Sequence, residues 1–297
     1  MDINDHELSK LDSVDLATMI RDGEISPTEA VQASIDRIEA LDGQLNAVVT
    51  RRFERALQDA AAEIPDGPFR GVPFLLKDLR TSSANEPMHL GNKALKEMNY
   101  ISPIESDLAR RYREAGFIVI GRTNTPEFGL VGTTEPESYG PSRNPWNTEY
   151  GTGGSSGGAA AAVASGMVPS ANASDGGGSI RIPAAMCGLV GLKPSRGRIP
   201  MGPIQDEWGL SIQHVVSRSV RDSAAILDAT AIPTLGDGVV APTTGQPYNS
   251  LIGSDPGKLR IGIWVESPRE ELEMHPECRE SAYATAQLLE PVSYTHL

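Results

Sequence analysis

The chain has 297 residues, of which 39 % are hydrophobic and 22 % charged, a composition typical of a folded globular protein with one large domain or two. Its formal net charge of −13 disfavours a protein that binds nucleic acid through phosphate contacts, because that class needs a basic surface. Two cysteines cannot form a disulfide framework or a zinc site by themselves, which fits a reducing compartment.

The first half of the chain predicts helices that alternate with short apolar strands. Its N-terminus is acidic and polar, without the apolar region of a signal peptide, and no apolar run is long enough to span a bilayer. We therefore expect a cytoplasmic protein without membrane contacts. In chain order the sequence predicts helix 26–43 with a capping box, strand 46–50, helix 51–63, strand 71–77, helix 107–114 and strand 117–120.

Residues 121–200 differ from the flanking segments, because they are dense in Gly, Ser, Asn and Pro. Loops on a rigid scaffold commonly carry chemistry, and this is the longest such region in the sequence. The remaining elements predicted are helix 158–165, helix 219–229, a connecting loop at 232–256, strand 259–265 and helix 276–289. Helices alternating with buried strands predict an α/β fold with a mostly parallel sheet.

A first glycine cluster occupies residues 151–158. It lacks the spacing of a dinucleotide loop and the Lys-Ser/Thr pair of a P-loop. Residues 153–157 do form a G-x-S-x-G pattern, which in α/β-hydrolases presents a nucleophile directly after a strand. Here residues 144–147 are turn formers, so that interpretation is disfavoured. A flexible linker is disfavoured too, because an Ala-rich helix follows at once.

A second glycine cluster runs from Asp175 to Pro183 and places three glycines before Ser179. Consecutive backbone N–H groups in such a loop can turn toward one point, as an oxyanion hole or an anion-binding nest requires. The alternative is a tight turn in which Ser179 caps a helix. The local sequence leaves both interpretations open.

A serine nucleophile needs a base, and the histidines stand in unrelated contexts. Lys77 ends an apolar run, so it is a candidate: burial lowers the pKa of a lysine and makes the neutral amine available. The alternative is a lysine at a strand end that reaches water or pairs with Asp78.

Taken together, the motifs at 71–78, 121–128, 153–158, 175–184 and 187–198 resemble the amidase signature family. The resemblance extends from about residue 8 to 289. It implies one α/β domain with a mixed, mostly parallel central sheet covered by helices on both faces. The family's catalytic lysine falls on Lys77, its bridging serine on Ser155 and its nucleophile on Ser179, with Ser156 as a neighbour.

The resemblance also implies a mechanism without metal or organic cofactor. Neutral Lys77 takes a proton from Ser155, which takes one from Ser179, and the Ser179 Oγ attacks an amide carbonyl. The relay then protonates the leaving amine, and water hydrolyses the acyl-enzyme. The oxyanion would be held by the backbone N–H groups of Gly176, Gly177, Gly178 and Ser179.

Within the family, residues 16–31 and 133–146 resemble 6-aminohexanoate cyclic-dimer hydrolases, which implies a small cyclic or linear amide as substrate. The alternative is the glutaminase-type subunit of a tRNA-dependent amidotransferase, which shares the triad. A non-catalytic binding protein is disfavoured because all three triad positions are present. The resemblance leaves a homodimer open.

The C-terminus departs from the family pattern. Members run well beyond this length, and residues 291–297 break the helix that residues 284–289 fit, while 292–297 resemble a translated sequencing-library adapter. We therefore expect a C-terminally truncated amidase domain over 1–290 and a non-native tail over 291–297. Without the remainder of the sheet, the chain is expected neither to fold cooperatively nor to hydrolyse amides.

Overall fold

A six-stranded sheet forms the centre of the computed structural model, which describes residues 8–204, 209–269, 271–290 and 293–296. In spatial order its strands are β1 (Val48–Arg51), β5 (Ile118–Thr123), β2 (Pro73–Lys77), β8 (Ser170–Asp175), β10 (Ile212–Ser217) and β9 (Val190–Gly191). Parallel pairing joins β5, β2 and β8, and β9 runs in the same direction, whereas β1 and β10 are antiparallel to their neighbours. The predicted mixed, mostly parallel sheet is thus confirmed.

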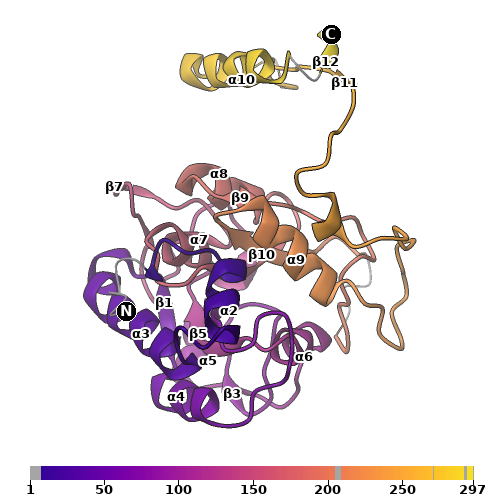
Figure 1. Ribbon diagram of the computed structural model, residues 1–297. Coiled ribbons are helices and arrows are strands. Elements are labelled where there is room, and N and C mark those ends of the chain that lie inside the picture. The colour runs from indigo at the N-terminus through magenta and orange to yellow at the C-terminus, as the bar shows by residue number, and fades with distance from the viewer. Residues whose placement is uncertain (1–7, 205–208, 270, 291–292, 297) are drawn as a thin grey trace. The chain divides into compact units, whose positions relative to one another are not determined.

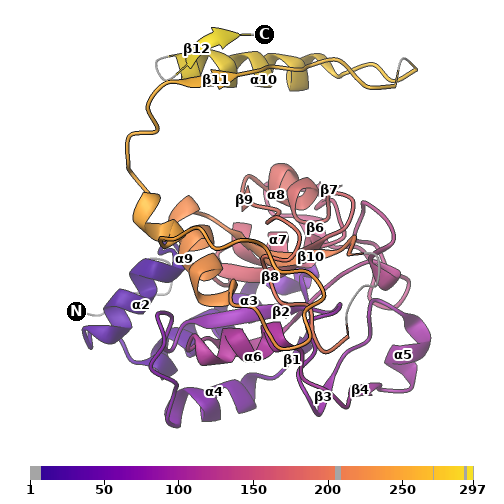
Figure 2. The same ribbon diagram turned by 90° about the vertical axis from the view of Figure 1, so that its right-hand side faces the viewer.

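Helices cover both faces of this sheet, as predicted (Figures 1 and 2). Alternate residues of β2 point to opposite faces: Leu75 packs in one core cluster, whereas Phe74 and Leu76 pack in the other. On the Leu75 side lie mainly α3 (Pro27–Leu45), α4 (Phe53–Ala61), α7 (Gly157–Ala164) and α8 (Arg181–Cys187). On the other side lie α2 (Ser13–Arg21), α6 (Asp107–Glu114) and α9 (Val220–Thr230).

Small side chains allow α7 to approach the sheet closely. Ala159, Ala161 and Ala162 of α7 are fully buried and share a core cluster with Ala171 and Ala173 of β8. At Gly158 an added Cβ would lie 2.3 Å from the backbone N of Asn124, so only glycine fits between the helix and the end of β5. This contact holds the N-terminus of α7 beside the carboxyl end of the central strands.

Short elements complete the described chain. None of its helices is long and apolar enough to cross a membrane. Two small antiparallel pairs join β3 (Glu86–Pro87) with β4 (Ile101–Ser102) and β6 (Arg143–Asn144) with β7 (Asn147–Gly151). The short helices are α5 (Lys93–Glu97) and the 3₁₀ turns η1 (Glu127–Gly129) and η2 (Tyr248–Leu251).

The chain divides into two compact units, Met1–Ile252 and Gly253–Leu297. In the second unit, β11 (Leu259–Ile261) pairs in parallel with β12 (Ser293–His296), and α10 spans Pro276–Leu289 as predicted. The strand predicted over 259–265 is shorter than expected. Its first two residues are exposed rather than buried, and the strand pairs with β12 in a separate two-stranded sheet rather than with the central sheet. That residues 1–290 form one amidase domain stays a prediction.

Candidate active site

Lys77 is the last residue of β2, and its side chain lies wholly inside the protein. Its Nζ is 2.7 Å from the Oγ of Ser155 and 2.9 Å from the Oγ atoms of Ser156 and Ser174. Burial lowers the pKa of Lys77 well below its ordinary 10.5, although the nearby charge of Asp175 acts in the opposite direction. A neutral amine keeps a lone pair, so one of these hydroxyls can donate to it.

The carboxylate of Asp78 does not pair with Lys77. It accepts the N–H groups of His89 (2.8 Å) and Gly91 (3.3 Å). The lysine therefore neither reaches water nor forms an ion pair with its neighbour, and the three serine hydroxyls surround its amine.

The two serines before α7 have different surroundings. Ser156 is tied to β8, because its Oγ accepts the Ser174 N–H at 3.2 Å and donates to the Ser174 carbonyl at 3.3 Å. Ser155 follows a cis peptide bond, and its Oγ would lie 3.2 Å from a Cβ added at Gly129. Of these two hydroxyls, that of Ser155 is the one not bonded to the backbone of β8. This arrangement fits Ser155, rather than Ser156, as the bridging residue.

Ser179 lies half-buried in the turn between β8 and α8. Its carbonyl accepts the N–H of Ser156 at 3.2 Å, which joins the two glycine clusters of the sequence. The structure therefore brings the segments of Lys77, Ser155 and Ser179 together, although they are far apart along the chain.

Asp175 fixes the loop that carries Ser179. Its carboxylate accepts the N–H groups of Gly178 (2.7 Å) and Ile180 (3.2 Å) and pairs with both Nε and Nη2 of Arg181 at 2.9 and 3.0 Å. Burial alone would raise the pKa of Asp175, but the Arg181 and backbone hydrogen bonds outweigh it and lower the pKa to about 2. The carboxylate is therefore ionised at neutral pH.

The same bonds bear on the predicted oxyanion hole. Because the Gly178 N–H donates to Asp175, it is not directed at a substrate in this structure. Gly178 instead serves the turn: its φ is +125°, and an added Cβ would lie 2.7 Å from Ile182 Cδ1. For the N–H groups of Gly176, Gly177 and Ser179 the oxyanion role stays a prediction.

Replacing Asp175 tests this loop. We expect Asp175→Asn to lower kcat about 10–100-fold, because the loop that orients the nucleophile loosens, while the surface control Asp66→Asn changes little. A folded pKa near 2, below the ordinary 3.8, means that ionised Asp175 stabilises the fold above pH 3.8 and that this contribution is lost as the pH falls through 2. The Tm difference between wild type and Asp175→Asn should therefore shrink in acid. A constant difference would contradict this role.

Residues 29–295 match the family model described as Amidase. The chain belongs to the Amidase family. It is 43 % identical over 282 residues to the 6-aminohexanoate-cyclic-dimer hydrolase of Paenarthrobacter ureafaciens, a match that covers 94 % of this chain and 57 % of that protein. The chain thus spans little more than half the length of this curated relative.

Solved structures of family members agree with this assignment. A structure of 6-aminohexanoate cyclic dimer hydrolase complexed with substrate has a TM-score of 0.94 and 41 % identity and covers 98 % of this chain and 61 % of its own. A glutamyl-tRNA(Gln) amidotransferase subunit from Thermotoga maritima has a TM-score of 0.82 and 26 % identity, with coverage of 100 % and 62 %. Both share the fold, and the first is markedly more similar in sequence.

Sequence reasoning missed two features of this candidate site. Ser174, the third hydroxyl on Lys77, lies on β8, a strand that the sequence did not predict. A strand, β7, does precede the Gly151–Gly158 cluster, contrary to the expectation of turns alone. It is largely exposed and pairs with β6 rather than with the central sheet, so the strand context of a hydrolase nucleophile is still missing.

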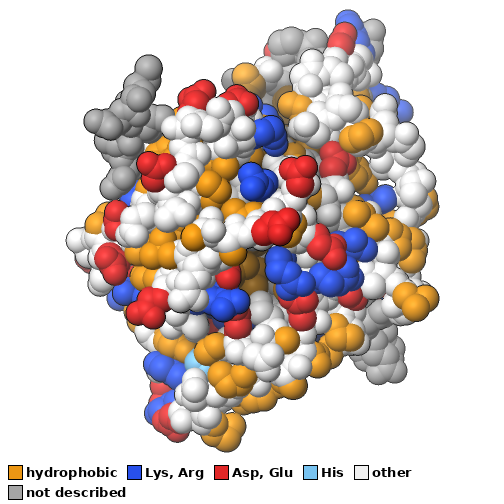
Figure 3. Space-filling model, turned by 60° about the horizontal axis from the view of Figure 1, so that its bottom comes forward, with side chains coloured by type: hydrophobic (Ala, Val, Ile, Leu, Met, Phe, Trp, Pro, Cys, Tyr) orange, Lys and Arg blue, Asp and Glu red, His pale blue; other side chains and the backbone are white. Residues whose placement is uncertain are grey.

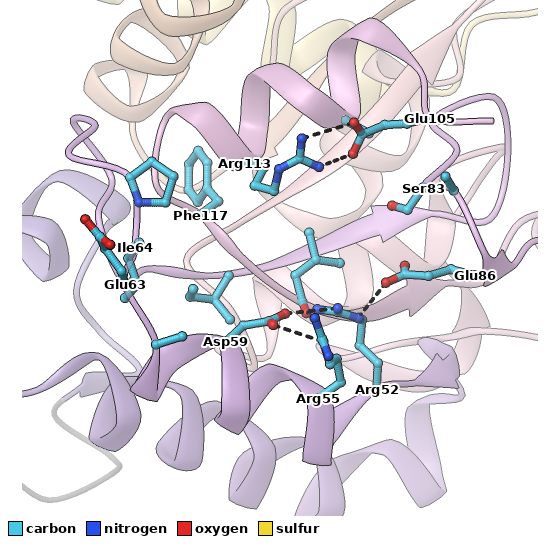
Figure 4. A pocket seen from close by; sticks show the side chains of 16 residues that line it. Arg52, Arg55, Asp59, Glu63, Ile64, Ser83, Glu86, Glu105, Arg113 and Phe117 are labelled. Atoms are coloured by element: carbon cyan, nitrogen blue, oxygen red, sulfur yellow. Dashed lines mark hydrogen bonds and ion pairs between the residues drawn. The ribbon is translucent and has the colours of Figure 1, made fainter.

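A cavity of about 390 Å³ lies away from these residues, between α4 and α6 and beside the start of β5. Most of its charged side chains pair with one another: Arg52 and Arg55 both contact Asp59, Arg52 also contacts Glu86, and Arg113 contacts Glu105 (Figure 4). On the face shown in Figure 3, basic side chains adjoin acidic ones rather than form one basic surface. The paired charges give this cavity no evident catalytic group.

Proposed function

We propose that the protein is an amidase that hydrolyses a carbon–nitrogen amide bond through Lys77, Ser155 and Ser179. The observation that carries this proposal is the buried amine of Lys77, 2.7 Å from the Ser155 hydroxyl and free of any carboxylate partner among the described residues. Family membership supports it independently.

In the proposed reaction, Lys77 removes the proton of Ser155 while Ser155 removes that of Ser179. The Ser179 Oγ then forms a bond to the amide carbonyl carbon, and the backbone N–H groups of Gly176, Gly177 and Ser179 bind the oxyanion. As the C–N bond breaks, the proton returns through Ser155 to the leaving amine. Water attacks the resulting ester by the same relay and releases the acid, which restores Ser179.

The proposed substrates are cyclic or linear amides of the 6-aminohexanoate cyclic dimer type. The support is the 43 % identity to a hydrolase of that name and the TM-score of 0.94 to its structure with substrate. The alternative, a glutaminase-type amidotransferase component, has weaker support from a relative at 26 % identity.

An assay of the whole protein on such amides, without any other protein added, separates these functions. We expect a new free amino group to form from 6-aminohexanoate cyclic dimer, by ring opening, or from a linear analogue, and this reaction should not depend on tRNA. Glutamine hydrolysis that appears only when partner proteins are added would favour the amidotransferase instead.

A further inference from the structure

The backbone of Lys77 is held by side chains where the strand ladder ends. β2 and β8 have one register pair, Leu75 with Ala171. Past that pair, the Lys77 N–H donates to the side-chain Oδ1 of Asn172 on β8, at 3.2 Å. A side-chain oxygen thus replaces the backbone carbonyl that a continued parallel ladder would supply.

Asn172 is fully buried, and its partners fix its orientation. Its Nδ2 donates to the carbonyl of His214 on β10 at 3.2 Å and lies 3.4 Å from the Tyr112 hydroxyl. A backbone N–H only donates and a carbonyl only accepts, so the amide must turn its oxygen to Lys77 and its nitrogen to His214. Leucine, of similar size, could satisfy neither group.

The carbonyl of Lys77 is held from the opposite side of β2. Arg122 on β5 is buried, and its Nη1 lies 3.2 Å from the Lys77 carbonyl and 2.8 Å from that of Thr81. Both peptide groups of Lys77 therefore bond to side chains from neighbouring strands. With its backbone fixed in this way, the amine is directed at the Ser155 and Ser156 hydroxyls.

We infer that Asn172 is a positioning residue for Lys77: it fixes the Lys77 peptide so that the amine stays sealed among the serine hydroxyls. The kinetic part of this inference rests on the proposed function, but the position of the amine does not. Without the Asn172 amide, the end of β2 gains freedom and the Lys77 amine gains access to water. Hydration favours the charged form, so the pKa of Lys77 should rise toward its ordinary value.

The test measures the pKa of Lys77 directly. A ¹³C NMR titration of the Lys77 Cε in the whole protein, with the signal assigned by its loss in Lys77→Met, is compared between wild type and Asn172→Leu. We expect the pKa to rise by about one unit or more in the variant. On the amide substrate, kcat should fall about 10–100-fold with KM changed little. The rise of kcat/KM with pH should move to higher pH together with the pKa of Lys77.

Thr230→Val is the matched control: Thr230 is also fully buried, and its hydroxyl donates to the Ile226 carbonyl at 2.7 Å, a bond that involves neither Asn172 nor Lys77. It should lower Tm without moving the Lys77 pKa or kcat. If Asn172→Leu fails to fold, Asn172→Ser, which leaves room for water, replaces it. This variant should also raise the Lys77 pKa and lower kcat, each by less than Asn172→Leu.

A folded Asn172 variant with the wild-type Lys77 pKa would overturn the inference, as would an equal shift in Thr230→Val. If wild type hydrolyses no amide, the proposed function fails, yet the NMR titration still decides whether Asn172 positions Lys77.

Discussion

Ser179→Ala should reduce amide hydrolysis by the whole protein to background, a loss of at least about 10³-fold in kcat. The Ser179 Oγ forms the covalent bond in the proposed reaction, and removal of a nucleophile from a triad leaves only the contribution of binding and oxyanion stabilisation. The methyl group of alanine fits the half-buried turn, so the fold should be retained, as a thermal melt can verify. Steady-state kinetics on 6-aminohexanoate cyclic dimer or a linear amide give the measurement.

Ser165→Ala is a suitable control for this prediction. Ser165 caps the other end of α7, where its hydroxyl bonds to the Ala161 carbonyl at 2.7 Å, so its loss should leave kcat near wild type. Substantial turnover by Ser179→Ala would show that another residue is the nucleophile.

Lys77→Met should remove the rise of kcat/KM with pH and lower kcat/KM about 10²–10⁴-fold. In wild type, only the unprotonated amine can accept the Ser155 proton, so kcat/KM should rise with pH through one ionisation. Because burial lowers the pKa of Lys77 well below 10.5, the midpoint should lie below that of a free lysine. The profile of kcat/KM against pH, recorded for wild type and variant, gives the test.

Lys93→Met controls for the loss of a lysine in general. Its amine is exposed and pairs with Glu137, and its removal should leave the profile unchanged. If kcat/KM of Lys77→Met still rises with pH through the same ionisation, Lys77 is excluded as the base.

The sequence predicted the elements whose burial depends on apolar side chains. The run at 71–77 gave β2, and the helix predicted over 107–114 has the bounds of α6. β8 was missed because its residues are small or polar, and β10 because Gln213 and His214 interrupt its apolar residues, although both strands are fully buried. The alanines of β8 allow it to pack closely against α7. In β10, the Nε2 of buried His214 lies 3.0 Å from the Ser223 Oγ, which gives this polar side chain a hydrogen-bond partner. Such tertiary contacts, rather than local hydropathy, make these segments strands.

The candidate site likewise contains residues that the sequence predicted and residues that it did not. Lys77, Ser155 and Ser179 followed from a resemblance, since local sequence alone left a snorkelling lysine and a helix cap open as alternatives. Ser174 and Asn172 could not be found without the strand that carries them. The bond from Gly178 to Asp175 depends on the fold of a loop whose glycines, in sequence, all looked equally suited to an oxyanion hole.

Identification of the residue that becomes covalently modified tests the central claim most directly. The whole protein, treated with a fluorophosphonate that phosphonylates activated serines, is digested and its peptides are analysed by mass spectrometry. We predict a single adduct on Ser179, absent in Ser179→Ala and strongly slowed in Lys77→Met. An adduct on Ser155 or Ser156 would contradict the proposed relay and show that the G-x-S-x-G serine is the nucleophile.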